Sequence, residues 1–527
     1  MKNRILLTLL SVALLLSSCM KDLGNYDYKE ISDFEITGVE KNYSVILLEN
    51  LKIPASITST SGDYSYAWFI ELADLSSGFS DATYADTISH ELVLDIPFKY
   101  APGNYTLNLK VTNNETGVAK YVQTTVSGVT KFSKGYYMLK ETSDGNTEMD
   151  LHYIDGGMAE NIITNVTGSP LQGKPKTLSY LNDFSYLNEE TGEKDINFLM
   201  IPLSEQGMLT FNMTDMSIAR NYEHWYYGDA LAVNKISHMA NFGFCYGMFT
   251  TEGLFSNYQN ALYGMLSVGK YANSADIMYD GTAIYSCGPH VCHFGYDNYC
   301  YDAVNNQIID VDYNGGVSPI YFQYPPLMQG QSATAETIKD NVVYMGGICG
   351  LNDDNVVIVC EREDKTRYWY YASAEIQNYS AEMNIVYKAD FEAGSPFQTA
   401  DKFATCRLNG TYLYTISNNE IYALNPTNGY STKLEFPSMP AGEITYMDTM
   451  WYENKYDPEA SSNYFVLATY SNGNYTVALY DMIGGEPVKD KEPVKVLTGK
   501  GKIKSIQHAD PGKQGNVWSE TTYSVHY

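Results

Sequence analysis

The chain has 527 residues, and its 62 Asp and Glu against 34 Lys and Arg give a formal net charge of −28 at pH 7. This acidic excess argues against nucleic acid or an anionic lipid surface as a binding partner. Only 18% of the residues are charged, whereas Tyr occurs 48 times and Gly 41 times, which is typical of a β-rich protein with many turns. The length is sufficient for two or more domains with full cores.

The N-terminus has the pattern of a lipoprotein signal peptide at residues 1–18. Lys2 and Arg4 precede the apolar run Ile5–Leu16, which is too short to span a bilayer permanently. Leu16-Ser17-Ser18-Cys19 then matches a lipobox. We therefore expect Cys19 to be lipidated and to become the first residue of a protein anchored in the outer membrane, on its extracellular face. The alternative is an ordinary secretory signal with a chance cysteine, although no Ala-x-Ala cleavage site follows.

Residues 19–30 are polar and turn-rich, and we interpret them as a tether. Over residues 31–128, short strand patterns alternate with turns, and the number of strands fits an immunoglobulin-like sandwich. The pattern Tyr66-x-Trp68, followed by Gly103-x-Tyr105 and strict apolar-polar alternation, resembles PKD-type modules. The sequence therefore predicts an Ig/PKD-like β-sandwich at 31–128.

From Lys131 onward, strand pairs joined by Asn, Asp and Gly turns recur in units of roughly 35–60 residues, a spacing typical of propeller blades. We expect units starting near residues 133, 174, 234, 279, 333, 404 and 443, with a closing strand from about Lys502. The predicted fold class is thus all-β, a sandwich followed by a β-propeller of about seven blades at 131–527. Six or eight blades, or another β structure, remain open alternatives.

These parts together resemble the PKD-like family of bacterial surface lipoproteins. The lipobox is followed by Lys21-Asp22-Leu23-Gly24-Asn25-Tyr26-Asp27-Tyr28, which is similar to the family's opening string, with Leu23 in place of its usual lysine. The Trp68 strand and residues 103–112 match the family's sandwich domain. Residues 134–139 resemble the strand that opens its second region.

The resemblance implies a component of a TonB-dependent nutrient uptake complex, as in starch-utilisation systems. Its partners would be the TonB-dependent outer-membrane transporter and its substrate-binding lipoprotein, and its ligand an oligosaccharide or a peptide. The family supplies no catalytic motif, and we find no common hydrolase or phosphate-loop motif. We expect a non-catalytic binding or accessory protein without a cofactor. The alternative is a surface propeller enzyme, a glycoside hydrolase or polysaccharide lyase.

The residues predicted to bind a ligand are His224, Trp225, Tyr226 and Tyr227. Core strands rarely place such polar-aromatic side chains consecutively, so this run is typical of a loop or a strand end, where ligand sites gather. Aromatic faces bind sugar rings or peptide side chains by stacking. The alternative is that these side chains simply pack between blades.

Cys287, Cys292 and Cys300, with His290 and His293, form the densest group of metal-ligand side chains. Their spacing fits none of the common zinc frameworks, and on a strand Cys292 and His293 would point to opposite faces. We therefore expect buried or partly paired cysteines and no metal site.

The lipobox gives a prediction on localisation. Replacing Cys19 by Ala removes the only thiol at which the lipobox can be acylated, so cell fractionation should find the protein released from the membrane fraction and without acyl label. Membrane association that persists without acyl label would contradict lipid anchoring.

Overall fold

The structure is a computed structural model. It describes residues 34–47, 49–58, 62–73, 83–100, 103–132, 134–154, 156–187, 192, 194–242, 245–258, 269–273, 285–294, 297–312, 316–349, 354–377, 380–406, 410–454, 462–509 and 521–523. The signal peptide, the lipobox with Cys19 and the tether lie outside these residues. Within them, no helix is long and apolar enough to cross a membrane.

The N-terminal part is a β-sandwich built around Trp68, which is completely buried. Its main sheet has the order β2-β9-β8-β5-β6, and β3 with β7 and β1 with β4 form small pairs. Leu107, Leu109 and Val111 of β8 face the core at every second position, because alternate side chains of a strand share a face. The strands are β1 (Ile36–Thr37), β2 (Asn42–Ile46), β3 (Asn50–Ile53), β4 (Ser56–Ile57), β5 (Tyr64–Ala73), β6 (Thr83–Ser89), β7 (Leu94–Pro97), β8 (Gly103–Asn113) and β9 (Ala119–Val129).

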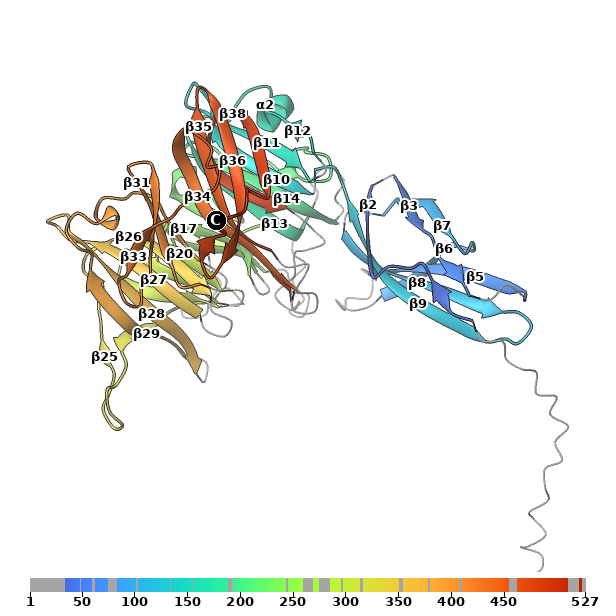
Figure 1. The fold of residues 1–527 in the computed structure, drawn as a ribbon, viewed down its shortest axis with the longest axis horizontal. Helices are drawn as coiled ribbons and strands as arrows, with labels where there is room; N and C mark the ends of the chain where they lie inside the picture. The colour runs from blue at the N-terminus through green and yellow to red at the C-terminus, as the bar shows by residue number, and fades with distance from the viewer. Residues whose placement is uncertain are drawn as a thin grey trace, which may run out of the picture.

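Seven sheets follow within the described residues, and each is one blade of a propeller (Figure 1). Blade 1 contains β39 (Lys502–Ala509), β10 (Gly135–Glu141), β11 (Thr147–Tyr153) and β12 (Met158–Ala159). Blade 2 contains β13 (Pro175–Leu187), β14 (Lys194–Ser204) and β15 (Phe211–Asn212). Blade 3 contains β16 (Ile236–Phe242), β17 (Cys245–Thr250), β18 (Gly253–Tyr258) and β19 (Ala272–Asn273). Blade 4 contains β20 (Val291–Phe294), β21 (Asp297–Asp302), β22 (Gln307–Val311) and β23 (Val317–Pro319).

Blade 5 contains β26 (Asn341–Cys349), β27 (Asp354–Glu361), β28 (Arg367–Gln377) and β29 (Ser380–Asp390), extended at its outer edge by β24 (Tyr321–Tyr324) and β25 (Thr334–Ala335). Blade 6 contains β30 (Phe403–Thr405), β31 (Leu413–Ser417), β32 (Glu420–Leu424) and β33 (Ser431–Lys433). Blade 7 contains β34 (Glu443–Asn454), β35 (Ser462–Ser471), β36 (Asn474–Ile483), β37 (Glu486–Pro487), β38 (Lys495–Lys500) and β40 (Thr521–Tyr523). These elements confirm the predicted all-β class.

The first blade closes the ring with a strand from the C-terminal part of the chain. β39 pairs antiparallel with β10, from Gly135 opposite Ala509 to Glu141 opposite Lys502. The strand starts after Gly501, whose φ of +104° suits glycine, and a Cβ there would lie 2.9 Å from the carbonyl oxygen of Glu141. β39 also contacts β13 of blade 2 and β34 of blade 7, so it joins both neighbours of blade 1.

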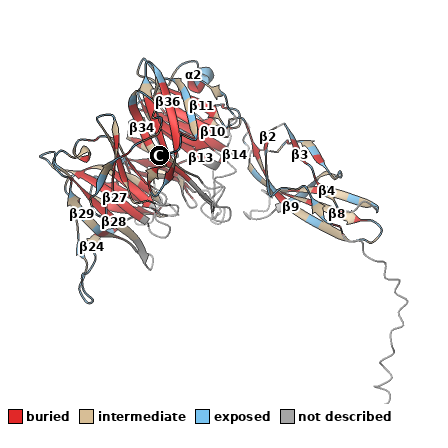
Figure 2. Cartoon of the chain, in the orientation of Figure 1, coloured by how far each residue is buried: buried red, intermediate tan, exposed pale blue. Residues whose placement is uncertain are grey.

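Each blade packs against a neighbour on both faces, so both sets of alternating side chains are buried. On β28, Tyr368 and Tyr370 lie in the core shared with blade 4, while Trp369 and Tyr371 lie in the core shared with blade 6. The strands of the propeller are accordingly buried over most of their length, whereas those of the sandwich alternate between buried and exposed residues (Figure 2). All four consecutive aromatic side chains of this propeller strand are therefore buried in packing between blades, and none of them forms an exposed surface.

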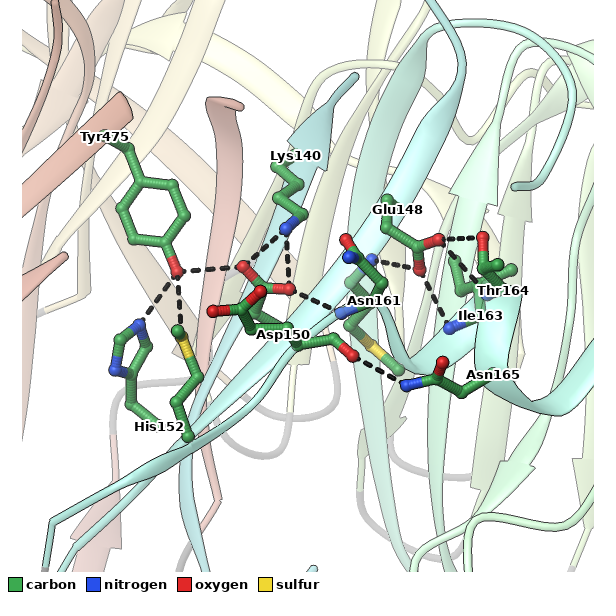
Figure 3. A network of polar contacts seen from close by, with 12 residues as sticks. Lys140, Glu148, Asp150, His152, Asn161, Ile163, Thr164, Asn165 and Tyr475 are labelled. Carbon is green, nitrogen blue, oxygen red and sulfur yellow. Dashed lines mark hydrogen bonds and ion pairs between the residues drawn. The ribbon is translucent and has the colours of Figure 1, made fainter. Parts of the chain in front are cut away.

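A buried polar network fixes the seam between blades 1 and 7 (Figure 3). The Lys140 ammonium lies 2.6 Å from both carboxylate oxygens of Asp150, and the Tyr475 hydroxyl of blade 7 donates to the same carboxylate at 3.0 Å. The His152 ring nitrogen Nε2 lies 2.8 Å from that hydroxyl. Burial lowers the pKa of His152, which keeps the imidazole neutral.

The neighbouring carboxylate of Glu148 holds the short helix α2 (Ile162–Thr167) against blade 1. It accepts hydrogen bonds from the backbone N–H groups of Ile163 and Thr164, at 2.8 and 3.1 Å, and from the Thr164 hydroxyl. These N–H groups have no partner inside the helix, so Glu148 satisfies donors that would otherwise be orphaned. Both carboxylates of the network are thus fully used in holding the fold.

The seam network predicts a large stability loss for Lys140→Met. The substitution leaves the Asp150 carboxylate buried without its cation, so urea unfolding should show a free energy of unfolding lower by about 3–5 kcal/mol. Lys491→Met is the matched control, because its ion pair with Asp481 is exposed and should change the free energy by less than about 1 kcal/mol. Equal effects of the two variants would contradict the structural role of the network.

Candidate functional site

Among the described residues, the innermost strands of the seven blades are β39, β13, β16, β20, β26, β30 and β34. Six of them stand at one end of their blade's strand order, and β34 is followed there only by the short β40. We call the end of the ring at which they begin the start face. On β13, the Lys176 ammonium donates to the Ile236 carbonyl, and the Ser179 hydroxyl accepts from the Met239 N–H at 2.9 Å. From the first contact to the second, the residue number increases by three on both β13 and β16, so these strands run in the same direction.

The same arrangement recurs between blades 6 and 7. The Lys402 ammonium donates to the Ile444 carbonyl at 3.4 Å, and the Thr449 hydroxyl donates to the Thr405 carbonyl at 2.9 Å. β30 and β34 therefore also run in the same direction. The lysines Lys176, Lys402 and Lys502 stand at or just before the beginnings of β13, β30 and β39, so they share the start face.

The polar side chains of the innermost strands have a common task. An innermost strand carries backbone groups that pair with no further strand, and such groups need partners when they are buried. Ser505 accepts from the Leu178 N–H at 3.3 Å, and Thr405 donates to the Gly347 carbonyl at 2.6 Å. Hydroxyls from one blade thus satisfy the backbone of the next, which explains buried Ser and Thr near the axis.

Two histidines connect blades 3 and 4. The Nε2 atoms of His238 on β16 and His293 on β20 are 2.9 Å apart, and Nδ1 of His293 lies 2.5 Å from the Asn298 side-chain oxygen. The amide oxygen only accepts, so His293 carries its proton on Nδ1 and receives the proton of His238 on Nε2. Burial lowers the pKa of His238 to about 3, and its ring stacks on Phe249. The His238 ring is therefore neutral near pH 7.

The predicted ligand residues His224, Trp225, Tyr226 and Tyr227 do not form an exposed aromatic platform. Trp225 is completely buried and Tyr226 nearly so, in the core between blades 2 and 3. The Trp225 ring packs on Phe184, and the Tyr226 hydroxyl donates to that of Tyr222 at 2.8 Å. The prediction that Trp225 and Tyr226 form part of an exposed ligand-binding loop is therefore wrong. Each blade packs on both faces, and aromatic side chains from connecting segments are buried between blades as well.

His224 and Tyr227 are exposed. The Tyr227 N–H donates to the Tyr271 carbonyl, next to β19, which is the outermost strand of blade 3. The run therefore belongs to the outer edge of blade 3. Its exposed members are not brought together with the lysines of the start face, and a ligand-binding role for them remains a prediction.

The cysteine group is divided between two cores. Cys287 and Cys300 lie in the core between blades 3 and 4, and Cys292 lies in the core between blades 4 and 5. Cys292 and His293 point to opposite faces of β20, as strand alternation predicts. Burial, with Cys287 beside it, raises the pKa of the Cys300 thiol, whereas a zinc ligand has to lose its proton readily.

No group of three or more His, Cys, Asp or Glu side chains within the described ranges is arranged to hold a metal ion. The innermost strands thus offer a different chemistry at the start face: lysine ammonium groups beside backbone carbonyls. This end of the ring is the candidate ligand-binding face. In the sequence, the signal for this face is a lysine at the beginning of an expected blade, as at Lys176, Lys402 and Lys502. The sequence alone does not distinguish such a lysine from an ordinary solvated one.

A match to the PKD-like family covers residues 19–175, which is less than a third of the chain. The chain carries a PKD-like domain. The match includes the sandwich and the strands β10, β11 and β12 of blade 1, and it ends at the first residue of β13. No curated protein matches the chain.

The solved structures to which the chain is similar share little sequence with it. A quinonprotein alcohol dehydrogenase-like protein from Bacteroides thetaiotaomicron is 12% identical with a TM-score of 0.36, over 89% of this chain and 97% of that one. An auxiliary nutrient binding protein from Bacteroides ovatus is 8% identical with a TM-score of 0.29, over 89% and 90%. The WD40 domain of SCAP from fission yeast is 8% identical with a TM-score of 0.29, over 63% and 75%.

The neutral His238 predicts that stability falls in mild acid. Its folded pKa of about 3 is below the ordinary value of 6.5, so below pH 6.5 the unfolded chain takes up a proton that the folded ring does not. Between about pH 6.5 and pH 5, the free energy of unfolding from urea titrations should fall by roughly 1.5 kcal/mol from this group. His238→Phe should remove that part of the pH dependence.

The control for this measurement is His90→Asn in the sandwich, where the imidazole is exposed. This variant should keep the full pH dependence of the wild type. A His238→Phe protein with unchanged pH dependence would contradict the neutral, buried state of His238.

Proposed function

We propose that the protein is a lipid-anchored outer-membrane lipoprotein that binds an oligosaccharide or a peptide without chemical conversion, as an accessory of a TonB-dependent uptake complex. Its partners are the transporter and the substrate-binding lipoprotein of that complex. The lipobox at Cys19 and the PKD-like match support the anchored, surface-exposed setting. The ligand surface in this proposal is the start face of the propeller.

The observation that carries the proposal is the position of the start face relative to the sandwich. The sandwich leads into β10 at Gly135, which pairs with Ala509 at the end of β39, while Lys502 at the start face lies at the other end of that strand. A strand of this length separates its ends by roughly 20 Å. The Thr130 hydroxyl also donates to the Met213 carbonyl at the junction. The start face therefore points away from the sandwich.

A face directed away from the sandwich is available to ligands or partner proteins. The acidic chain gives no attraction to an anionic membrane surface. The polar network of blade 1 offers no reactive group, because Lys140, Asp150 and Glu148 are buried and bound to one another, to Tyr475 or to α2. These features favour binding over catalysis.

The test is calorimetry with the full-length, detergent-solubilised protein against a panel of oligosaccharides and short peptides. We expect saturable binding of one class and no new reducing ends, unsaturated sugars or peptide fragments after incubation. Product formation would contradict the non-catalytic part of the proposal, and the absence of binding to any member of the panel would contradict the binding part.

Tyr227→Ala tests whether the ligand binds at the start face or at the aromatic run predicted from the sequence. Because Tyr227 lies at the outer edge of blade 3, its loss should leave the affinity within about threefold of wild type. Tyr430→Ala is the control, since Tyr430 in blade 6 is exposed to a similar extent, 67% against 64%. A loss of about tenfold or more for Tyr227→Ala alone would return the binding site to the aromatic run.

A further inference from the structure

The connection between the sandwich and the propeller is short. β9 ends at Val129 and β10 begins at Gly135, so only residues 130–134 join the two parts, and we call these residues the joint. Flexible linkers are typically rich in Gly and Ser, whereas the joint, Thr-Lys-Phe-Ser-Lys, has no Gly and a single Ser. Segments between domains are usually exposed and make few contacts. Two residues of the joint, Thr130 and Phe132, depart from this pattern.

The end of β9 is bonded to both parts of the protein. Val129 and Thr130 are both buried. The Val129 carbonyl accepts from the Leu47 N–H of the sandwich at 2.7 Å, and the Thr130 hydroxyl donates to the Met213 carbonyl of blade 2 at 2.7 Å. Met213 follows β15, and its own N–H donates to the Phe198 carbonyl of β14 at 2.9 Å. Two successive residues thus connect the sandwich with the backbone of blade 2.

Phe132 is held by its backbone and by its ring. Its N–H donates to the Thr130 hydroxyl at 3.2 Å, and its carbonyl accepts from the Tyr137 hydroxyl. Tyr137 is completely buried, and burial raises the pKa of its hydroxyl, which therefore keeps the proton that it donates. The Phe132 ring packs against the core between blades 1 and 2. The middle of the joint is thus part of the propeller.

The joint leads directly into the paired part of blade 1. Gly135 lies opposite Tyr153 on β11 and opposite Ala509 on β39, so β10 is paired on both sides from its first residue. A Cβ at Gly135 would lie 2.4 Å from the carbonyl oxygen of His152, which leaves no room for a side chain there. The joint therefore ends at a closely packed position in blade 1.

We propose that the joint is rigid and holds the sandwich and the propeller in one orientation. A rotation about it would have to break the hydrogen bond between Thr130 and Met213 and to expose the Phe132 ring, and both changes cost free energy. The inference goes beyond the proposed function, because it holds whatever the ligand is. Its consequence is that the start face keeps a fixed direction relative to the sandwich.

The experiment is pulsed electron paramagnetic resonance on the full-length, detergent-solubilised protein with two nitroxide labels. Tyr121→Cys on β9 and Val496→Cys on β38 supply one label in the sandwich and one in the propeller, at side chains that are 63% and 51% exposed. Val496→Cys with Tyr430→Cys in blade 6 is the reference pair within the propeller. We expect the sandwich–propeller distance distribution to be a single peak as narrow as that of the reference pair.

The native cysteines give the background of this measurement. The free cysteines among the described residues are buried and should stay unlabelled. The chain without added cysteines, treated with the same label, measures any remaining signal, which is subtracted from both pairs.

Thr130→Val and Phe132→Ala test the joint itself. The first removes the hydroxyl that bonds to Met213, and the second removes the packed ring. Each should broaden the sandwich–propeller distribution and leave the reference pair unchanged. Thr124→Val is the matched control, because the Thr124 hydroxyl, on the same strand β9, donates at 3.0 Å to the Lys41 carbonyl within the sandwich. This control should leave both distributions unchanged.

Trypsin gives a second readout without labels. Lys131 in the joint and Lys489 in a turn of blade 7 are both exposed, but cleavage after Lys131 requires the joint to open first. We expect cleavage after Lys131 to be at least about tenfold slower than after Lys489 in the wild type. Thr130→Val should speed cleavage after Lys131 by about fivefold and leave cleavage after Lys489 unchanged.

Two results would overturn the inference. A wild-type sandwich–propeller distribution much broader than that of the reference pair, or cleavage after Lys131 as fast as after Lys489, would show that the joint is flexible. A narrow distribution that stays narrow in both Thr130→Val and Phe132→Ala would show that these contacts do not hold the orientation.

Discussion

The propeller depends on the pairing of β39 with β10, which joins a strand near the C-terminal end to the first strand after the sandwich. An open ring would leave the edges of blade 1 and blade 7 exposed, with unpaired backbone groups and uncovered cores. Closure of the ring covers the edges of both blades. The contact is remote in sequence, so its chain-entropy cost is high, and the buried seam network of Lys140, Asp150 and Tyr475 helps to offset it.

Ring closure also creates the chemistry near the axis. Seven innermost strands each present backbone groups that have no further full-length strand to pair with, and these groups need donors and acceptors. Hydroxyls of Ser179, Ser505, Thr405 and Thr449 and ammonium groups of Lys176 and Lys402 meet that need across blade boundaries. The lysines do so with only part of their donor capacity.

Packing on both faces of a blade decides where the aromatic side chains lie. In a sandwich, one face of each sheet is solvated, so a strand with consecutive aromatic residues should expose half of them. In the propeller, Trp369 and Tyr370 point in opposite directions and both are buried. Trp225, from a connecting segment, is taken into a core between blades in the same way. High tyrosine content is thus mainly a packing property of this chain.

The β class, the sandwich and much of the blade pattern could be predicted from the sequence, because strand alternation and turn residues are local signals. The expected starts near 174, 234, 404 and 443 lie within two residues of the starts of β13, β16, β30 and β34. Which side chains remain exposed depends on the packing between distant segments. Trp225 is buried because the blades bring distant segments together, and no local pattern encodes the neighbour that a residue acquires across a blade boundary.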